Sequence, residues 1–296
     1  MQIITIIFLL KKTGSVMTSK HKIIGLTSLI LTASAGYGLC EASTVNTIDI
    51  KALTQPHIHL GPHGVTTGKS QYESGESGEG GFDNQSLETD DIAFLTALNV
   101  IRAHYAIGEK LYAAHDYNAA ENFFGHPITE VLIELKPAFK HRNIKSLEEP
   151  MYDLLDIAQN KNDLVALKKG IEKVLNDITL IQNKIKKEHA KTYIKIISTV
   201  NADLLRRSKL EYFQAIKTQS LGHLQDAIGY FNVASALFET HKQEYQSLDA
   251  EKSNEIDTYF TNLKPYFDDY KTINIDKNHK KLAGMMAKIE LFLINI

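Results

Sequence analysis

The feature that most constrains this chain is a helical spacing of apolar residues that continues from residue 91 to residue 296. Phe94, Leu98 and Ile101 recur at intervals of three or four residues, which places them on one face of a helix. No alternating strand pattern with an Asn-Gly or Asp-Gly turn interrupts this region. We therefore expect residues 91–296 to form an all-α domain, an antiparallel helical bundle with short connections.

Capping residues and glycines indicate where the first helices begin and end. Asp90 precedes a helix over 91–114, because its carboxylate can accept hydrogen bonds from the free N–H groups of the first turn. Asp116 precedes a short helix over 117–124, which Gly125 is expected to end.

The next helix is predicted to begin at His126 as N-cap, with Pro127 at the first helical position, and to end at Pro137. The remaining helices follow from apolar spacing alone. They are predicted at 148–159, at 161–184 with Gly170 as a candidate break, and at 187–218, 221–246, 250–270 and 277–295.

The N-terminal residues have the composition of an export signal. Counted from Met17, the basic stretch Lys20–Lys22 precedes an apolar segment, Ile23–Thr32, that is too short to span a bilayer. Small residues suited to cleavage follow it. We therefore predict a signal region over 1–42 whose true start is Met17, and a mature protein that is periplasmic or secreted.

The single cysteine, Cys40, lies in the predicted cleavage region, where it is either removed with the signal or carries a lipid. Leu39 before it is bulky where a lipid-attachment motif has a small residue, which argues against lipidation. Because the chain has only one cysteine, no intrachain disulfide can form. Packing must therefore stabilise the fold.

Residues 43–90 are rich in Gly, Ser, Glu and His and are predicted to form a flexible linker. Three imidazoles lie close together within it, at His57, His59 and His63. Histidine-rich tracts bind late transition metals, so these residues are candidate auxiliary chelators. The alternative is that they only keep the linker soluble.

Charge and motif content exclude several classes of function. The 33 Lys and Arg residues nearly balance 35 Asp and Glu residues, so the chain lacks the positive field that gathers nucleic acid. The chain contains no run of 18 or more apolar residues, so no transmembrane span is predicted in the mature chain. A Gly-x-Ser-x-Gly motif, a phosphate-binding loop and a His-Glu-x-x-His motif are all missing. The sequence therefore predicts a protein that is not an enzyme.

Histidines and carboxylates on the first helices form a candidate metal site. His104 lies on or beside the apolar face of its helix, and Glu130 and Glu134 share a face one turn after His126. Helical bundles build metal sites from such side chains on facing helices. These four residues are therefore candidate ligands of a transition metal, iron or copper. The alternative is that His104 donates to a carbonyl in the core, His126 caps a helix and both glutamates are solvated.

Two stretches also resemble a known group of proteins. The first, His104–Pro137, includes His104-Tyr105-Ala106-Ile107-Gly108 and His126-Pro127, and the second is Gln225–Phe231. They resemble uncharacterised exported helical proteins of alphaproteobacteria, and faintly the periplasmic helical regions of iron permeases and imelysin-type proteins. The resemblance covers residues from about 74 to 245 and implies a periplasmic helical protein near metal or iron handling, with His104, His126 and Glu130 as ligands. Phe123 and His223 depart from the family pattern.

The same region also has the spacing of a tetratricopeptide unit, in which small residues let two helices pack closely and aromatic residues fill the gap. Gly108, Ala120 and Phe124 fit this pattern, and Ala227 begins a second match. Ala120 and Ala227 are 107 residues apart, which is not a multiple of the repeat length of about 34, so helix pairing is expected without a repeat array. The alternative function is therefore a protein–protein interaction module with an envelope protein as partner.

Overall fold

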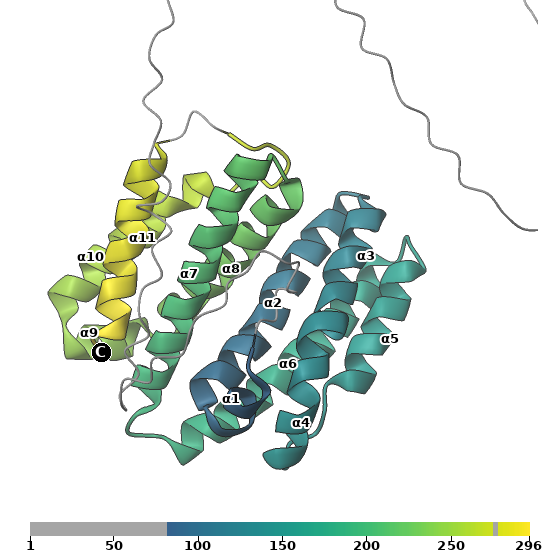
Figure 1. Cartoon of the computed structure of the whole chain (residues 1–296), viewed down its shortest axis with the longest axis horizontal. Coiled ribbons are helices and arrows are strands. Elements are labelled where there is room, and N and C mark those ends of the chain that lie inside the picture. The colour runs from purple at the N-terminus through teal and green to yellow at the C-terminus, as the bar shows by residue number, and fades with distance from the viewer. Residues whose placement is uncertain (1–81, 275–277) are drawn as a thin grey trace, which may run out of the picture. The chain divides into compact units, whose positions relative to one another are not determined.

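The computed structural model describes residues 82–274 and 278–296, and within these residues all regular structure is helical (Figure 1). The all-α prediction is thereby confirmed. The elements are α1 (Asn84–Thr89), α2 (Asp91–Ala113), α3 (Tyr117–His126), the π-helix η2 (Pro127–Leu132), α4 (Ile133–His141), α5 (Glu148–Gln159), α6 (Leu164–Glu188), α7 (Tyr193–Thr218), α8 (Leu221–Thr240), α9 (Lys242–Leu248), α10 (Ala250–Leu263), the 3₁₀-helix η3 (Lys264–Tyr266) and α11 (His279–Ile294).

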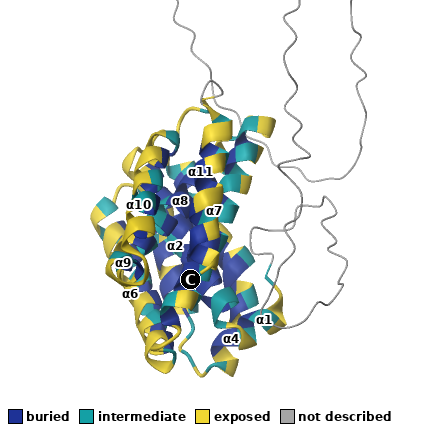
Figure 2. Cartoon of the chain, turned by 90° about the vertical axis from the view of Figure 1, so that its left-hand side faces the viewer, coloured by how far each residue is buried: buried dark blue, intermediate teal, exposed yellow. Residues whose placement is uncertain are grey.

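Helix α2 is the centre of the packing. It contacts α3 on one side and both α7 and α8 on the other, and α11 packs against α7 (Figure 1). Figure 2 shows that buried residues concentrate along α2, α7 and α8. Gly229 of α8 lies directly against the backbone of α2, because a Cβ there would be 2.7 Å from the carbonyl oxygen of Ala103. The missing side chain therefore sets the separation of these two helices.

Side-chain caps begin several helices at the predicted positions. The Asp90 carboxylate accepts a hydrogen bond from the N–H of Ile92 at the start of α2, and Asp116 accepts one from Ala119 at the start of α3. These bonds satisfy donors that have no partner inside the helix. Four other caps of this kind, at the starts of α6, α8, α10 and α11, are Asp163, Ser220, Asp249 and Asn278.

The boundaries predicted at Gly125, His126 and Pro137 are wrong. Helix α3 continues through Gly125 to His126 and passes directly into η2, and α4 continues beyond Pro137. His126 has helical backbone angles and makes no capping hydrogen bond through its side chain. Pro137 lies inside α4, where its missing N–H removes one bond of the helix without ending it.

Gly170 does not break α6. A Cβ at this position would lie 2.9 Å from Cδ1 of Leu154, so the glycine lets α6 pack closely on α5. The helix ends at Glu188 and α7 begins at Tyr193, later than the predicted end at 184 and start at 187. Neither glycine nor proline occurs at this turn, so no local signal marked it.

The folded domain begins before residue 91. Helix α1 lies inside the segment 43–90 that was predicted to be a flexible linker, and its Leu87 is fully buried. Asp83 caps this helix by accepting from the N–H of Ser86. The linker prediction is therefore wrong for the residues of α1. The other N-terminal predictions, namely the signal region 1–42 with its start at Met17, Cys40, and the histidines His57, His59 and His63, lie outside the described residues.

Two predicted C-terminal helices are each divided. The segment 221–246 is split at His241 into α8 and α9, and the α-helix predicted over 250–270 ends at Leu263. The second division follows from Pro265, which has no N–H to donate to the preceding turn. Of the helices in the described ranges, none has both the length and the apolar composition needed to cross a bilayer.

Candidate functional site

His104 lies in the core, with 2% of its surface exposed. Its Nδ1 is 2.9 Å from the carbonyl oxygen of Val100, and Nε2 is 3.8 Å from Oδ1 of Asp226 in α8. A carbonyl only accepts, so Nδ1 carries the proton and Nε2 faces the carboxylate. The rings of Phe123 and Tyr230 lie 5.9 and 6.1 Å away, measured between ring centroids. His104 is thus a core histidine bonded to a carbonyl, as the alternative interpretation of the sequence had it.

The other three predicted ligands lie at or near the surface. His126 is exposed, and Glu130 and Glu134 are half-buried. Burial raises the pKa of Glu134, and a hydrogen bond from the backbone N–H of Phe82 and the nearby charge of Arg207 partly oppose this rise. The Arg207 guanidinium also lies 4.7 Å from the centre of the Phe82 ring. Glu134 therefore helps to hold Phe82, shortly before α1.

No metal centre assembles from the described residues. Within residues 82–274 and 278–296, no group of three or more His, Cys, Asp or Glu side chains is arranged to hold a metal ion. His104, His126, Glu130 and Glu134 accordingly do not form such a group. Iron or copper binding stays a prediction from the sequence.

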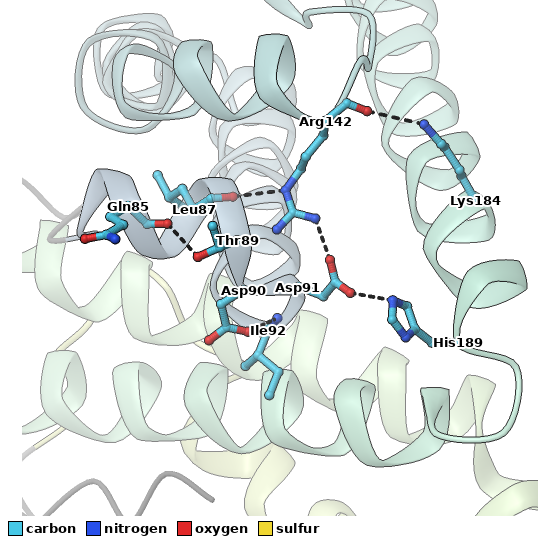
Figure 3. Close-up of polar contacts among 9 residues, drawn as sticks. All are labelled: Gln85, Leu87, Thr89, Asp90, Asp91, Ile92, Arg142, Lys184 and His189. Carbon is cyan, nitrogen blue, oxygen red and sulfur yellow. Dashed lines mark hydrogen bonds and ion pairs between the residues drawn. The ribbon is translucent and has the colours of Figure 1, made fainter. Parts of the chain in front are cut away.

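A polar cluster that the sequence did not predict joins the starts and ends of four helices (Figure 3). Arg142, after α4, pairs with Asp91 of α2 and donates from Nε to the carbonyl oxygen of Leu87 in α1 over 3.0 Å. His189, after α6, places Nε2 2.8 Å from the other oxygen of Asp91. Lys184 donates to the carbonyl oxygen of Arg142 over 3.4 Å. These residues are far apart in the sequence, so no spacing pattern could have predicted that they meet. The cluster connects separate segments of the chain to one another.

His241 was not among the predicted site residues, because it lies in a polar stretch of sequence. It is only 6% exposed and forms the junction between α8 and α9. Its Nδ1 lies 3.3 Å from Oε1 of Glu244, and the Tyr193 ring packs against it. Burial lowers the pKa of His241, and the interaction with Glu244 opposes part of this effect.

We expect His241 to weaken the fold as the solution is acidified. Its pKa is lower in the folded than in the unfolded chain, so the unfolded chain takes up a proton first as the solution is acidified. The free energy of unfolding therefore decreases as the pH drops below about 6.5. In the variant His241→Gln, the free energy of unfolding, measured by urea denaturation, should decrease less between pH 7.5 and pH 5.5 than it does in the unmodified chain. Lys186 and Glu244 are the charged neighbours of His241. An unchanged pH dependence in the variant would contradict the assignment.

A groove of about 350 Å³ lies between α8 and α10, which is in the lower part of the range for ligand pockets, roughly 300–1,000 Å³. Three buried aromatic rings, Phe231, Phe238 and Phe260, form its floor. The ring of Phe260 lies 5.0 Å from that of Phe238 and 6.1 Å from that of Phe231, so large side chains keep the two helices apart. The other lining residues are Asn232, Ser235, Ala236, Glu239, Asp257, Thr261, Lys264 and Asp268.

The groove has charged groups at both ends. At one end, Nζ of Lys242 lies 3.0 Å from Oδ2 of Asp257 and 3.3 Å from Oε2 of Glu239. At the other end, Phe267 stacks on Phe231 with the ring centroids 4.2 Å apart, which places the next residue, Asp268, beside the floor. An apolar floor between charged ends can bind an amphipathic ligand.

No protein-family model, curated protein or solved structure matches the chain. The resemblance to exported helical proteins of alphaproteobacteria therefore stays a prediction.

Proposed function

We propose that this chain is an exported, non-enzymatic helical protein of the cell envelope that binds a partner protein in the groove between α8 and α10. The observation that supports this proposal is the composition of the groove, a buried aromatic floor with a polar and charged rim. Protein interfaces have the same organisation, with an apolar centre enriched in aromatic residues and a polar border.

The size of the groove suits a short helical segment of a partner. Its lining on α8 runs from Phe231 to Glu239, which corresponds to about 12 Å at a rise of 1.5 Å per residue. Two turns of an amphipathic helix have about this length, and such helices bind in apolar grooves through side chains spaced three and four residues apart.

The packing of α2 on α3 is a second observation that supports an interaction module. In the packing of α2 on α3, a Cβ on Gly108 would lie 2.8 Å from Cζ of Phe124, so a glycine makes room for an aromatic ring. This contact supports a tetratricopeptide-like pairing of the two helices, in which small residues and aromatics alternate across the interface. Export rests on the signal composition of residues 1–42.

A photo-crosslinking amino acid placed at Ser235 tests the proposed function. The full chain is expressed in bacterial cells, irradiated and recovered from the envelope fraction. Ser235 lines the groove, so we expect it to crosslink one discrete envelope protein. The same amino acid at Val165, which is 66% exposed on α6 and outside the groove, is the matched control. The proposal fails if Ser235 crosslinks no partner, or if both positions crosslink the same proteins equally.

A further inference from the structure

The charges on the rim of the groove indicate what kind of partner it selects. Three carboxylates, Glu239, Asp257 and Asp268, line it together with one ammonium group, that of Lys264, so its lining carries a net negative charge. The carboxylates lie at both ends of the aromatic floor. A partner with positive charges flanking an apolar stretch is complementary to this arrangement.

Lys242 shows how the groove holds an ammonium group. Asp257 belongs to α10 and Glu239 to α8, so carboxylates from both sides of the groove converge on the same Nζ. The pKa of Lys242 is raised chiefly by its hydrogen bond with Asp257. Two carboxylates share this one cation, which leaves a negative charge for a second one.

The aromatic floor suits the rest of a basic side chain. Lysine and arginine have apolar stems that lie on aromatic rings while the charged end reaches polar groups at the border. Here the rings of Phe238 and Phe260 form the floor next to Asp257 and Glu239. A stem on the floor and a charge at the rim would satisfy both parts of the site.

We infer that the groove between α8 and α10 recognises a basic amphipathic segment of a partner protein, in which lysine or arginine side chains at both ends reach Glu239, Asp257 and Asp268. This inference rests on the proposed binding function and names the chemistry of the partner. Lys242 then competes with the partner's cation for the carboxylates of Glu239 and Asp257.

The test uses the full chain and two fluorescent twelve-residue peptides. In each peptide, pairs of leucine residues alternate with pairs of charged residues, which are lysines in one peptide and glutamates in the other. Fluorescence anisotropy at low salt should show binding of the lysine peptide, and weaker binding at high salt. Asp257→Asn should weaken this binding about threefold, as expected for an ion pair near the surface. Lys242→Met should strengthen it by a similar factor, because the competing ammonium group is lost.

Asp156→Asn is the control for net charge, because Asp156 is exposed on α5 and outside the groove. Its affinity for the lysine peptide should equal that of the unmodified chain. Equal binding of both peptides, an equal loss in the Asp156 and Asp257 variants, or no gain in Lys242→Met would overturn the inference. Thermal unfolding of each variant, followed by circular dichroism, checks that the fold is intact.

The two proposals fail in different ways. If Ser235 crosslinks an envelope protein while Asp257→Asn leaves the affinity for the lysine peptide unchanged, the binding function stands and selection by charge is wrong. If Ser235 crosslinks nothing, the binding function itself is wrong, whatever the peptides do.

Discussion

Replacing Phe124 with alanine is expected to lower the free energy of unfolding by about 4 kcal/mol, because it removes a buried aromatic ring and leaves a cavity. Phe124 is fully buried between α3 and α2, and its ring centroid lies 5.5 Å from that of Tyr105. Urea denaturation followed by circular dichroism measures the change. The loss should appear as a lower midpoint with an unchanged slope, since the surface exposed on unfolding stays nearly the same.

Gly108 provides the matched test, because the Phe124 ring occupies the space that a Cβ on Gly108 would need. In the unmodified chain, Gly108→Ala should overpack this contact and cost about 1–2 kcal/mol. In the Phe124→Ala background the same change should be neutral or stabilising, because the space is empty and alanine favours the helix. Gly284→Ala, at a site with no atom within 4 Å of the added Cβ, should stabilise the fold by up to about 1 kcal/mol. An equal effect of Gly108→Ala in both backgrounds would contradict the proposed contact.

The sequence predicted where helices begin better than where they end. A carboxylate such as Asp90 or Asp116 caps a helix through atoms of its own first turn, so the signal is local. A glycine is ambiguous, since it can end a helix or allow close packing. Gly125 and Gly170 were expected to interrupt helices, yet both lie inside helical segments, and at Gly170 the reason is Leu154, a residue of another helix. The identity of that neighbour cannot be read from local sequence.

The candidate site was harder to predict than the fold. The apolar environment of His104 followed from its helical position, but its partner Asp226 lies on a different helix, 122 positions further along. The groove was not predicted at all, because its floor combines Phe231 of α8 with Phe260 of α10, and no local pattern shows that these two residues meet. Periodicity reveals which face of a helix is buried, whereas a groove depends on how far apart two helices pack.

Helix periodicity likewise did not predict the cluster around Arg142 (Figure 3). The second large effect that we expect on stability comes from a substitution in this cluster. Arg142→Ala should lower the free energy of unfolding by about 3 kcal/mol, at the lower end of the range for removing one partner of a buried ion pair, because this pair is partly buried. The side chain is 12% exposed, and its guanidinium lies 4.5 Å from the centre of the Phe94 ring. Its loss removes the pair with Asp91, the bond to Leu87 and this ring contact together.

Two further variants separate charge from geometry in this cluster. Arg142→Lys keeps the positive charge but loses the planar group that bonds Asp91 and Leu87 at once, so it should recover only part of the stability. Lys184→Ala removes an exposed ammonium group that donates to the carbonyl oxygen of Arg142, and it should cost less than about 1 kcal/mol. Urea denaturation of the three variants gives the order. If Arg142→Ala costs no more than Lys184→Ala, the contacts of Arg142 do not hold α1, α2 and the end of α4 together.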